Sequence, residues 1–259
     1  MQKSLLLIMV ILLSACSMIP TPAINPSEQI VIKPSATSTI IPSLTPTQLA
    51  PTLTPSTPSP TADPHFFRDD FLAMLDAQWS WVREDPQNWS LSAVPGSLQI
   101  NVTGGYVPAH TNSNLLLRPA PRGNFQVETQ ITFRPADNFQ FAGLIIYESD
   151  SNFIQAGRGY CKVTGCIGEG LYMDFYKKGV IVEPDFGQAY KDIDPIRLRL
   201  SRSEDTYTFE ASTDGKVWFI IGSHTGDLNP LQIGLVTGQR LRGNILPAAF
   251  DYFEVRSLP

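Results

Sequence analysis

The chain has 259 residues and a net charge of −5 at neutral pH, and its hydrophobic fraction of 42% is enough for a folded domain with its own core. Its basic residues form no run longer than Lys177-Lys178. A nucleic-acid partner is therefore not expected, because neutralising a phosphate backbone takes clusters of Lys and Arg.

The first fifteen residues have the pattern of a secretory signal. Lys3 precedes an apolar run from Leu5 to Leu13, which is too short to span a bilayer but suits the central region of a signal peptide. The sequence Leu13-Ser-Ala-Cys16 resembles the lipobox of bacterial lipoproteins. That resemblance implies that residues 1–15 are removed and that Cys16 is lipidated. The protein would then be lipid-anchored in the cell membrane on its extracytoplasmic side. An ordinary signal peptide cut elsewhere and an uncleaved anchor are the alternatives.

Residues 16–64 form a different kind of segment. Eleven of the 22 prolines of the chain lie here, among many Thr and Ser residues and without a single aromatic side chain. Proline fixes φ and removes a backbone donor, so neither a helix nor a sheet ladder is expected. We predict a disordered linker that holds the following domain away from a membrane surface.

Residues 65–259 carry the pattern of an all-β domain. Side chains alternate between apolar and polar over 125–133, 196–201 and 207–212. A period of two with β-branched and aromatic residues is typical of half-buried antiparallel strands. Turn sequences such as Pro95-Gly96 and Asp214-Gly215 separate these stretches. The pattern predicts two antiparallel sheets in a sandwich or jelly roll.

Two cysteines remain once Cys16 is set aside, and they lie close together in the sequence. Cys161 and Cys166 flank a short segment that contains Gly165. A disulfide across a small loop is predicted, because this spacing allows the geometry and an extracytoplasmic location lets the bond persist. A metal pair is the alternative, but the spacing is poor for zinc and no His lies nearby.

A series of short sequences through the domain resembles a known family. Each is weak alone, and they are specific together: 67–71, 79–81, 84–91, 95–100, 114–119, 125–129, 140–147, 150–154, 212–218 and 250–255. Together they resemble the concanavalin A-like domain at the C-terminus of glycoside hydrolase family 43 β-xylosidases. Related stand-alone domains, named for similarity to a regulator of enolase, are also similar. The resemblance implies a concanavalin A-like jelly roll that serves as an accessory module beside a catalytic propeller. This chain has no room for the propeller, so xylosidase activity is not expected.

Polar and aromatic side chains on the open side of one sheet are the candidates for binding carbohydrate. Planar hydrogen-bonding groups beside flat rings suit sugar hydroxyls and the apolar faces of sugar rings. Tyr147 alternates away from Leu144 and Ile146, and four other residues join it if their strands are neighbours. The predicted set is Tyr147, Gln155, Arg158, Tyr172 and Arg197. An ordinary solvated sheet face is the alternative interpretation.

A calcium site is a further hypothesis. Concanavalin A-like folds often hold one Ca²⁺ near the chain ends, and Asp69 or Asp70 and Asp251 would meet there if the terminal strands pair. Calcium needs six or more oxygen ligands, of which these side chains supply only some. No other cofactor is predicted.

No sequence signature of catalysis is found in the chain, and His65, His110 and His224 are interpreted as surface residues. The sequence therefore predicts a non-catalytic, membrane-anchored protein that binds polysaccharide or cell-surface glycan. A protein-interaction or envelope scaffold is one alternative. A cryptic glycoside hydrolase is the other, and it would need two carboxylates about 5–9 Å apart in a groove.

Overall fold

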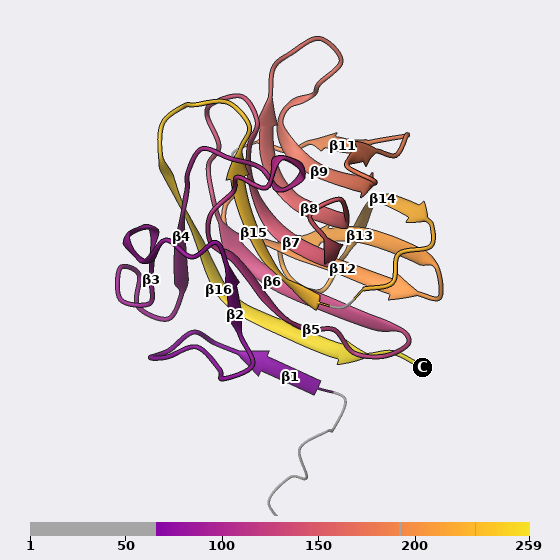
Figure 1. The fold of residues 1–259 in the computed structure, drawn as a ribbon, viewed down its shortest axis with the longest axis horizontal. Coiled ribbons are helices and arrows are strands. Elements are labelled where there is room, and N and C mark those ends of the chain that lie inside the picture. The colour runs from indigo at the N-terminus through magenta and orange to yellow at the C-terminus, as the bar shows by residue number, and fades with distance from the viewer. Residues whose placement is uncertain (1–65, 192, 231) are drawn as a thin grey trace, which may run out of the picture. The chain divides into compact units, whose positions relative to one another are not determined.

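The computed structural model describes residues 66–259 except 192 and 231. The predicted signal peptide (1–15), Cys16 and the predicted linker (16–64) lie outside the described residues. The described part is a sandwich of two antiparallel sheets with two short 3-10 helices, η1 (Pro86–Asn88) and η2 (Val107–Ala109) (Figure 1). The predicted all-β sandwich is confirmed. No helix in this part of the chain is long and apolar enough to cross a membrane.

The first sheet brings both ends of the domain together. β16 lies at its centre between β6 and β4, and β1 also pairs with β16. In order across the sheet the strands are β14 (Phe219–Thr225), β13 (Thr206–Ser212), β12 (Ile196–Ser203), β6 (Phe125–Thr132), β16 (Leu246–Ser257), β4 (Leu98–Val102) and β3 (Trp89–Ser90), with β1 (Phe66–Asp69) beside β16.

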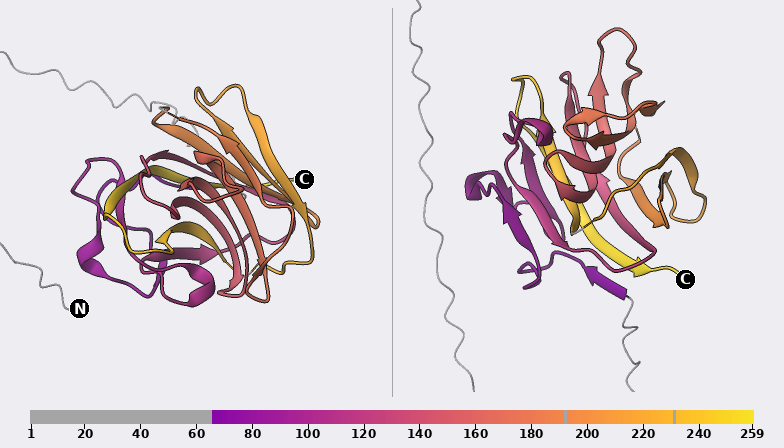
Figure 2. Two further views of the ribbon diagram at one scale, coloured as in Figure 1. Left: turned by 90° about the horizontal axis from the view of Figure 1, so that it is seen from above. Right: turned by 45° about the vertical axis from the view of Figure 1, so that its right-hand side comes forward.

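The second sheet has the same plan, with β15 inserted between β7 and β5. Strands that are distant in the sequence are therefore neighbours in both sheets, and the two layers can be followed in both views of Figure 2. In order the strands are β10 (Val180–Ile181), β9 (Gly168–Lys177), β8 (Asn152–Cys161), β7 (Gln140–Ser149), β15 (Gln232–Gln239), β5 (Leu115–Pro119) and β2 (Ser80–Val82), with β11 (Phe186–Ala189) beside β9.

The main core fills the space between the sheets. On β6 the side chains of Phe125, Val127, Thr129 and Ile131 are fully buried, and the three residues between them are half-buried. This is the alternation that the sequence predicts, because neighbouring residues of a strand point to opposite faces. Burial of these apolar side chains is the main force that holds the two layers together.

A second apolar cluster lies on the opposite side of the second sheet. Leu144 and Ile146 of β7 belong to the main core, whereas Ile145 between them belongs to this second cluster. The cluster therefore lies on the face of the second sheet that points away from the first sheet, which we call the open face. Its buried members are Val107, Leu115, Leu117, Ile145, Phe153 and Val236.

Candidate functional site

A pocket of about 210 Å³ opens on the open face of the second sheet, next to the second apolar cluster. Its residues come from β7, β8, β9, β10 and β15 and from the segments that connect the strands. Six aromatic side chains line it, namely Tyr106, Phe139, Phe141, Tyr160, Tyr172 and Tyr176. Among its polar lining residues are Gln155, Asp174, Asp185 and Arg240.

Glycines explain why this part of the sheet is hollow. Gly143 of β7 pairs with Gly157 of β8, and Gly159 lies two residues further along β8 at the pocket. A Cβ atom at Gly157 would lie 2.3 Å from the carbonyl oxygen of Ala142, so the backbones approach too closely for any side chain there. A Cβ atom at Gly159 would lie 3.0 Å from the Gln140 carbonyl oxygen and 3.3 Å from the Phe141 ring, so the absence of a side chain lets the rings of Phe141 and Tyr172 pack close to this backbone.

An amide and a carboxylate form the polar base of the pocket. Gln155 and Asp174 are register partners on β8 and β9, and the Gln155 Nε2 donates to Asp174 Oδ2 over 2.8 Å. Burial raises the pKa of Asp174 to about 6, opposed by the hydrogen bond from Gln155 and reinforced by the negative charge of Asp185. Within the described part of the chain, Gln155 is the only hydrogen-bond partner of this carboxylate. Oδ1 of Asp174 is thus available to accept from a ligand hydroxyl.

Arg240 supplies a positive charge to the lining. Its guanidinium carbon lies 5.4 Å from the ring centre of Tyr106 and 5.7 Å from that of Phe139. Among residues 66–259, gaps excepted, no carboxylate forms an ion pair with it. Two aromatic rings therefore hold the guanidinium, and its donors are available to a ligand.

A disulfide forms part of the pocket lining. Cys161, the last residue of β8, is bonded to Cys166, with 5.5 Å between the Cα atoms. Both residues line the pocket. The turn that they close is also held by a hydrogen bond from the Cys166 amide to the Val163 carbonyl oxygen, 3.0 Å long. The bridge therefore fixes the connection between β8 and β9 beside the pocket.

The open face contains three of the five residues that the sequence suggests for carbohydrate binding. Gln155 and Tyr172 line the pocket, and the Tyr172 hydroxyl donates to the Gly168 carbonyl oxygen over 2.5 Å. Tyr147 is on the same face but outside the pocket, where its ring packs against the second apolar cluster and its hydroxyl donates to Asp150 over 3.1 Å.

The prediction for Arg158 is wrong. Its side chain is fully buried and has the same orientation on β8 as Ile154 and Ala156, which belong to the core between the sheets. There it bonds to Glu169 over 2.5 Å and to the Ile193 carbonyl oxygen, and pairs with Asp194 over 3.4 Å. A buried charge needs such partners, and this one is unavailable to a ligand on the open face.

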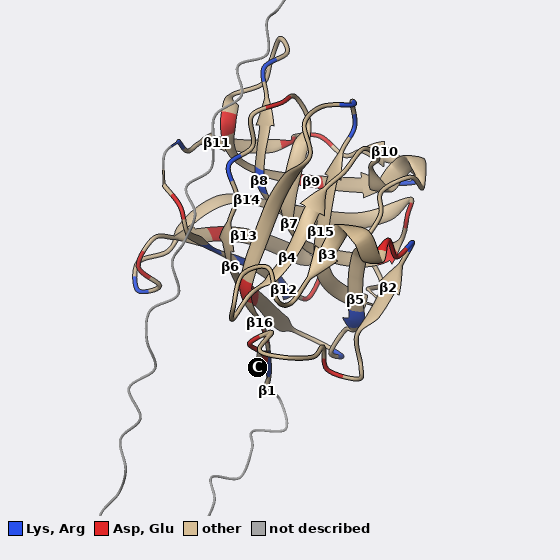
Figure 3. Cartoon of the chain, turned by 90° about the vertical axis from the view of Figure 1, so that its left-hand side faces the viewer, with Lys and Arg blue, Asp and Glu red and all other residues tan. Residues whose placement is uncertain are grey.

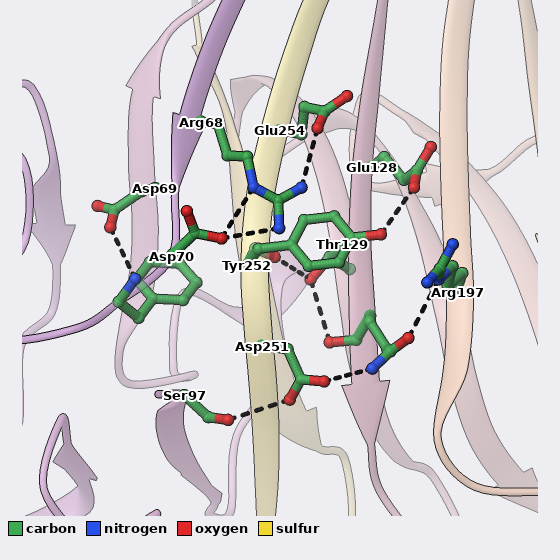
Figure 4. Close-up of polar contacts among 12 residues, drawn as sticks. Arg68, Asp69, Asp70, Ser97, Glu128, Thr129, Arg197, Asp251, Tyr252 and Glu254 are labelled. Carbon is green, nitrogen blue, oxygen red and sulfur yellow. Dashed lines mark hydrogen bonds and ion pairs between the residues drawn. The ribbon is translucent and has the colours of Figure 1, made fainter. Parts of the chain in front are cut away.

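The prediction for Arg197 is also wrong, because its strand lies in the other sheet. β12 pairs with β6 and β13 in the first sheet, so Arg197 cannot join Gln155 or Tyr172. Its Nε donates to the Gln130 Oε1 over 3.1 Å, and Gln130 in turn donates to Asp251 (Figure 4).

The proposed calcium ligands do not form a site. The terminal strands β1 and β16 do pair, but Asp70 forms an ion pair with Arg68 over 2.7 Å, and Asp251 accepts hydrogen bonds from Ser97 and Gln130 (Figure 4). Asp69 is equally engaged, accepting from two backbone amides and from the Trp79 indole. No group of three or more metal-ligating side chains occurs in the part of the chain that the structure describes. The donor set does not fit Ca²⁺, which needs six or more oxygens.

Two of the histidines lie within the described residues, and they differ. His110 is exposed and bonds through Nδ1 to Asp150 over 2.7 Å. His224 is buried against the rings of Phe175 and Phe186, so its interpretation as a surface residue is wrong. Burial lowers the pKa of His224. His65 lies outside the described residues.

Sequence reasoning missed most of the pocket. Tyr106, Phe139 and Arg240 lie in connections, where no strand pattern marks the direction of a side chain. Asp174 follows the strand alternation but resembles an ordinary solvated residue. The pair Gly157 and Gly159 within a predicted strand was the available signal, since glycines in strands often mark a close approach to a ligand or backbone.

Charge does not mark a large interaction surface in the view of Figure 3. Acidic and basic residues are interspersed there over the strands and connections.

Comparison with known proteins identifies the domain. Residues 68–256 match the model of the family described as Beta xylosidase C-terminal Concanavalin A-like domain. The chain belongs to this family. The resemblance of the domain to the concanavalin A-like domain at the C-terminus of family 43 β-xylosidases is thereby confirmed.

Relatives of known name are larger proteins. The chain is 25% identical over 208 residues to the non-reducing end alpha-L-arabinofuranosidase BoGH43B of Bacteroides ovatus, and 27% identical over 213 residues to a xylan 1,3-beta-xylosidase of a Vibrio species. These matches cover 74% and 72% of this chain but only 37% of each relative. This concanavalin A-like domain thus spans little more than a third of the proteins it resembles.

Solved structures show the same fold. The Bacteroides ovatus protein titled Xyloglucan PUL GH43B matches with a TM-score of 0.65 and 24% identity, over 79% of this chain and 42% of that one. A Bacillus licheniformis beta-glucanase matches with a TM-score of 0.52 and 11% identity, over 74% of this chain and 98% of that one. At these identities the likeness concerns the fold alone.

Proposed function

We propose that this concanavalin A-like domain is a non-catalytic carbohydrate-binding module, and that the pocket on the open face binds glycans that contain xylose or arabinose. The observation that carries the proposal is the Gln155–Asp174 pair in a pocket lined by six aromatic side chains. Sugar rings have apolar C–H faces and a rim of hydroxyls. Aromatic rings contact the faces, and a carboxylate with an amide exchanges hydrogen bonds with the rim.

The choice of sugar comes from the relatives. One is named as an arabinofuranosidase and another as a xylosidase that acts on xylan, so both names concern pentose glycans. A module that is related to part of such enzymes would bring a protein to the same polysaccharides. For this chain the sugar class is a proposal that rests on those names and on the chemistry of the pocket.

We further propose that the module works outside the cytoplasm, lipid-anchored in the cell membrane through Cys16 and held away from it by residues 17–64. The lipobox-like Leu13-Ser-Ala-Cys16 supports the anchor. The Cys161–Cys166 disulfide supports an oxidising location, since such bonds are rare in the cytosol. Mass spectrometry of the protein from membranes tests this. It should show an acylated N-terminal Cys16, and an unmodified N-terminus at another residue would contradict the anchor.

A glycan array probed with the full-length protein in mild detergent tests the sugar-binding function. Xylan, arabinoxylan and arabinan should give signal, and the Tyr172→Ala and Gln155→Ala variants should lose about tenfold or more in affinity, since each removes a direct contact. Arg197→Gln is the matched control, because Arg197 lies on the other sheet. Absence of binding to every pentose glycan would end the proposal, and so would equal loss in the control.

Glycoside hydrolysis is the second candidate, because Asp174 and Asp185 both line the pocket and the pKa of Asp174 is raised to about 6. Two carboxyl groups in one pocket, one of them with a raised pKa, are the groups that glycosidases use as acid and base. We expect no release of sugar from xylan or from nitrophenyl pentosides. Cleavage that disappears in both Asp174→Asn and Asp185→Asn would favour the enzyme instead.

A further inference from the structure

The segment between β4 and β5, residues 103–114, determines how far a ligand can extend over the open face. It carries η2, and its Tyr106 and Val107 line the pocket. Val107 is only 2% exposed and packs into the second apolar cluster with Ile145 and Leu117. The sheet surface beside the pocket is therefore occupied by the protein's own side chains.

This segment is fixed at its first residues. Gly105 and Gln239 exchange two backbone hydrogen bonds, 2.7 and 2.8 Å long. The chain also turns back on itself at this point, since a Cβ atom at Gly105 would lie 2.3 Å from the Thr111 carbonyl oxygen. Only glycine fits there, and the φ of +127° is one that other residues rarely adopt.

Polar contacts fix the other end of the segment. Arg83 donates to the Asn112 backbone oxygen over 2.8 Å and to its side-chain oxygen over 2.7 Å, and it forms an ion pair with Asp150 over 2.8 Å. His110 bonds to the same Asp150. Arg83, His110 and Asn114 all have φ between 54° and 57°. Such backbone conformations persist in non-glycine residues only where surrounding contacts hold them, so the segment is a fixed barrier and not a mobile lid.

Other sides of the pocket are bounded as well. The Cys161–Cys166 bridge lines one part, and Ile181 of β10 and Asp185 from the connection after it line another. The volume of about 210 Å³ is below the range of about 300–1,000 Å³ that holds drug-sized ligands. A space of this volume suits one sugar residue.

From this geometry we infer that the pocket binds the terminal residue of a glycan chain and not its interior. The inference rests on the proposed sugar-binding function and specifies it further. A sugar inside a chain has neighbours on two sides, and residues 103–114 block one of those directions. Recognition then depends on a free chain end, and residues beyond the first add little contact.

Calorimetric titration of the full-length protein in detergent tests this with xylobiose, xylotetraose and xylohexaose and with the matching arabino-oligosaccharides. In the series that binds, the affinity per chain should change less than about threefold with length. One chain end is then blocked. The non-reducing end is methylated at O4 or O5, which adds a steric clash, and the reducing end is reduced to the alditol, which removes the sugar ring. Blocking the end that the pocket binds should weaken binding about tenfold or more. Affinity that rises with length and ignores both blocked ends would overturn the inference and keep the proposed function. No binding in either series would end both.

Two variants examine the role of residues 103–114 directly. Tyr106→Ala shortens the barrier without touching the network of Arg83, and Arg83→Gln loosens its attachment. Either change should let oligosaccharides with both ends blocked bind. The ratio of the affinity for free-ended chains to the affinity for blocked chains should fall at least about threefold. Arg202→Gln, on the other sheet, is the control and should leave that affinity ratio unchanged. An unchanged affinity ratio in a folded Tyr106→Ala protein would refute the role of this segment.

Discussion

Replacing Asp174 by Asn should stabilise the protein at neutral pH while weakening its binding of sugar. The carboxylate sits at the base of the pocket, where burial raises its pKa to about 6 from the usual 3.8. Asn has nearly the same shape, and its side-chain oxygen can still accept the hydrogen bond from Gln155. The substitution therefore removes a charge and leaves the packing in place.

The magnitude follows from the pKa shift. A shift of about two units corresponds to about 3 kcal/mol, because one unit is about 1.4 kcal/mol. Asp174 is half-buried at a pocket that water enters, so we expect screening to reduce this cost to about 1–2 kcal/mol. Below pH 3.8 the carboxyl is protonated in both the folded and the unfolded state, and the cost is absent. The cost grows as the pH rises from 3.8 to about 6 and is complete above that value.

Thermal denaturation of the wild type and of Asp174→Asn measures the difference. At about pH 8 the variant should melt about 2–8 °C higher, since 1 kcal/mol shifts the Tm of a domain of this size by about 2–4 °C. At about pH 4 the difference should nearly vanish. Asp205→Asn, at an exposed turn, is the control and should show no such pH dependence. Equal Tm shifts at both pH values, or a lower Tm at about pH 8, would refute the reasoning.

Three other changes have definite expected outcomes. Replacing Cys161 and Cys166 by Ser should lower the free energy of unfolding, measured by urea denaturation, by about 2 kcal/mol, as expected for a short closed loop. The same change should weaken sugar binding because both residues line the pocket. Unchanged affinity would exclude them from the site. His224→Gln should reduce the loss of stability between about pH 6.5 and pH 5, because burial lowers the pKa of His224 and the unfolded chain takes up the proton first; an identical pH profile would contradict this. Phe209→Ala should cost about 3–5 kcal/mol, as for other large core residues, whereas a loss below about 1 kcal/mol would mean that the core has closed around the cavity.

Much of the fold could be predicted because strands with one buried face alternate between apolar and polar residues in the sequence. β6 alternates between buried and half-buried residues because one of its faces is covered and the other meets solvent. The second sheet is harder to interpret. Leu144, Ile145 and Ile146 are all fully buried on β7, since both faces of that strand are covered. Without alternation the sequence does not say which way a residue points, and the side-chain direction of Arg158 was missed for this reason.

The candidate site was only partly predictable. Gln155 and Tyr172 were found by their chemistry and strand position, and both line the pocket. Arg197 has equally suitable chemistry, but the sheet to which a strand belongs depends on pairing between distant segments. Tyr106 and Arg240 lie outside the strands, so alternation gives no information about them.

The sequence by itself was enough to predict an all-β domain of a recognisable family, because strand alternation and turn residues are local properties of the chain. It also predicts the signal peptide and the lipid anchor at Cys16. Only the tertiary structure decided which residues share a pocket. Asp174 and Gln155 meet through the register of β8 and β9, and contacts with Arg83 and Gln239 fix residues 103–114 beside the pocket. Those contacts join segments far apart in the chain, and no local pattern specifies them.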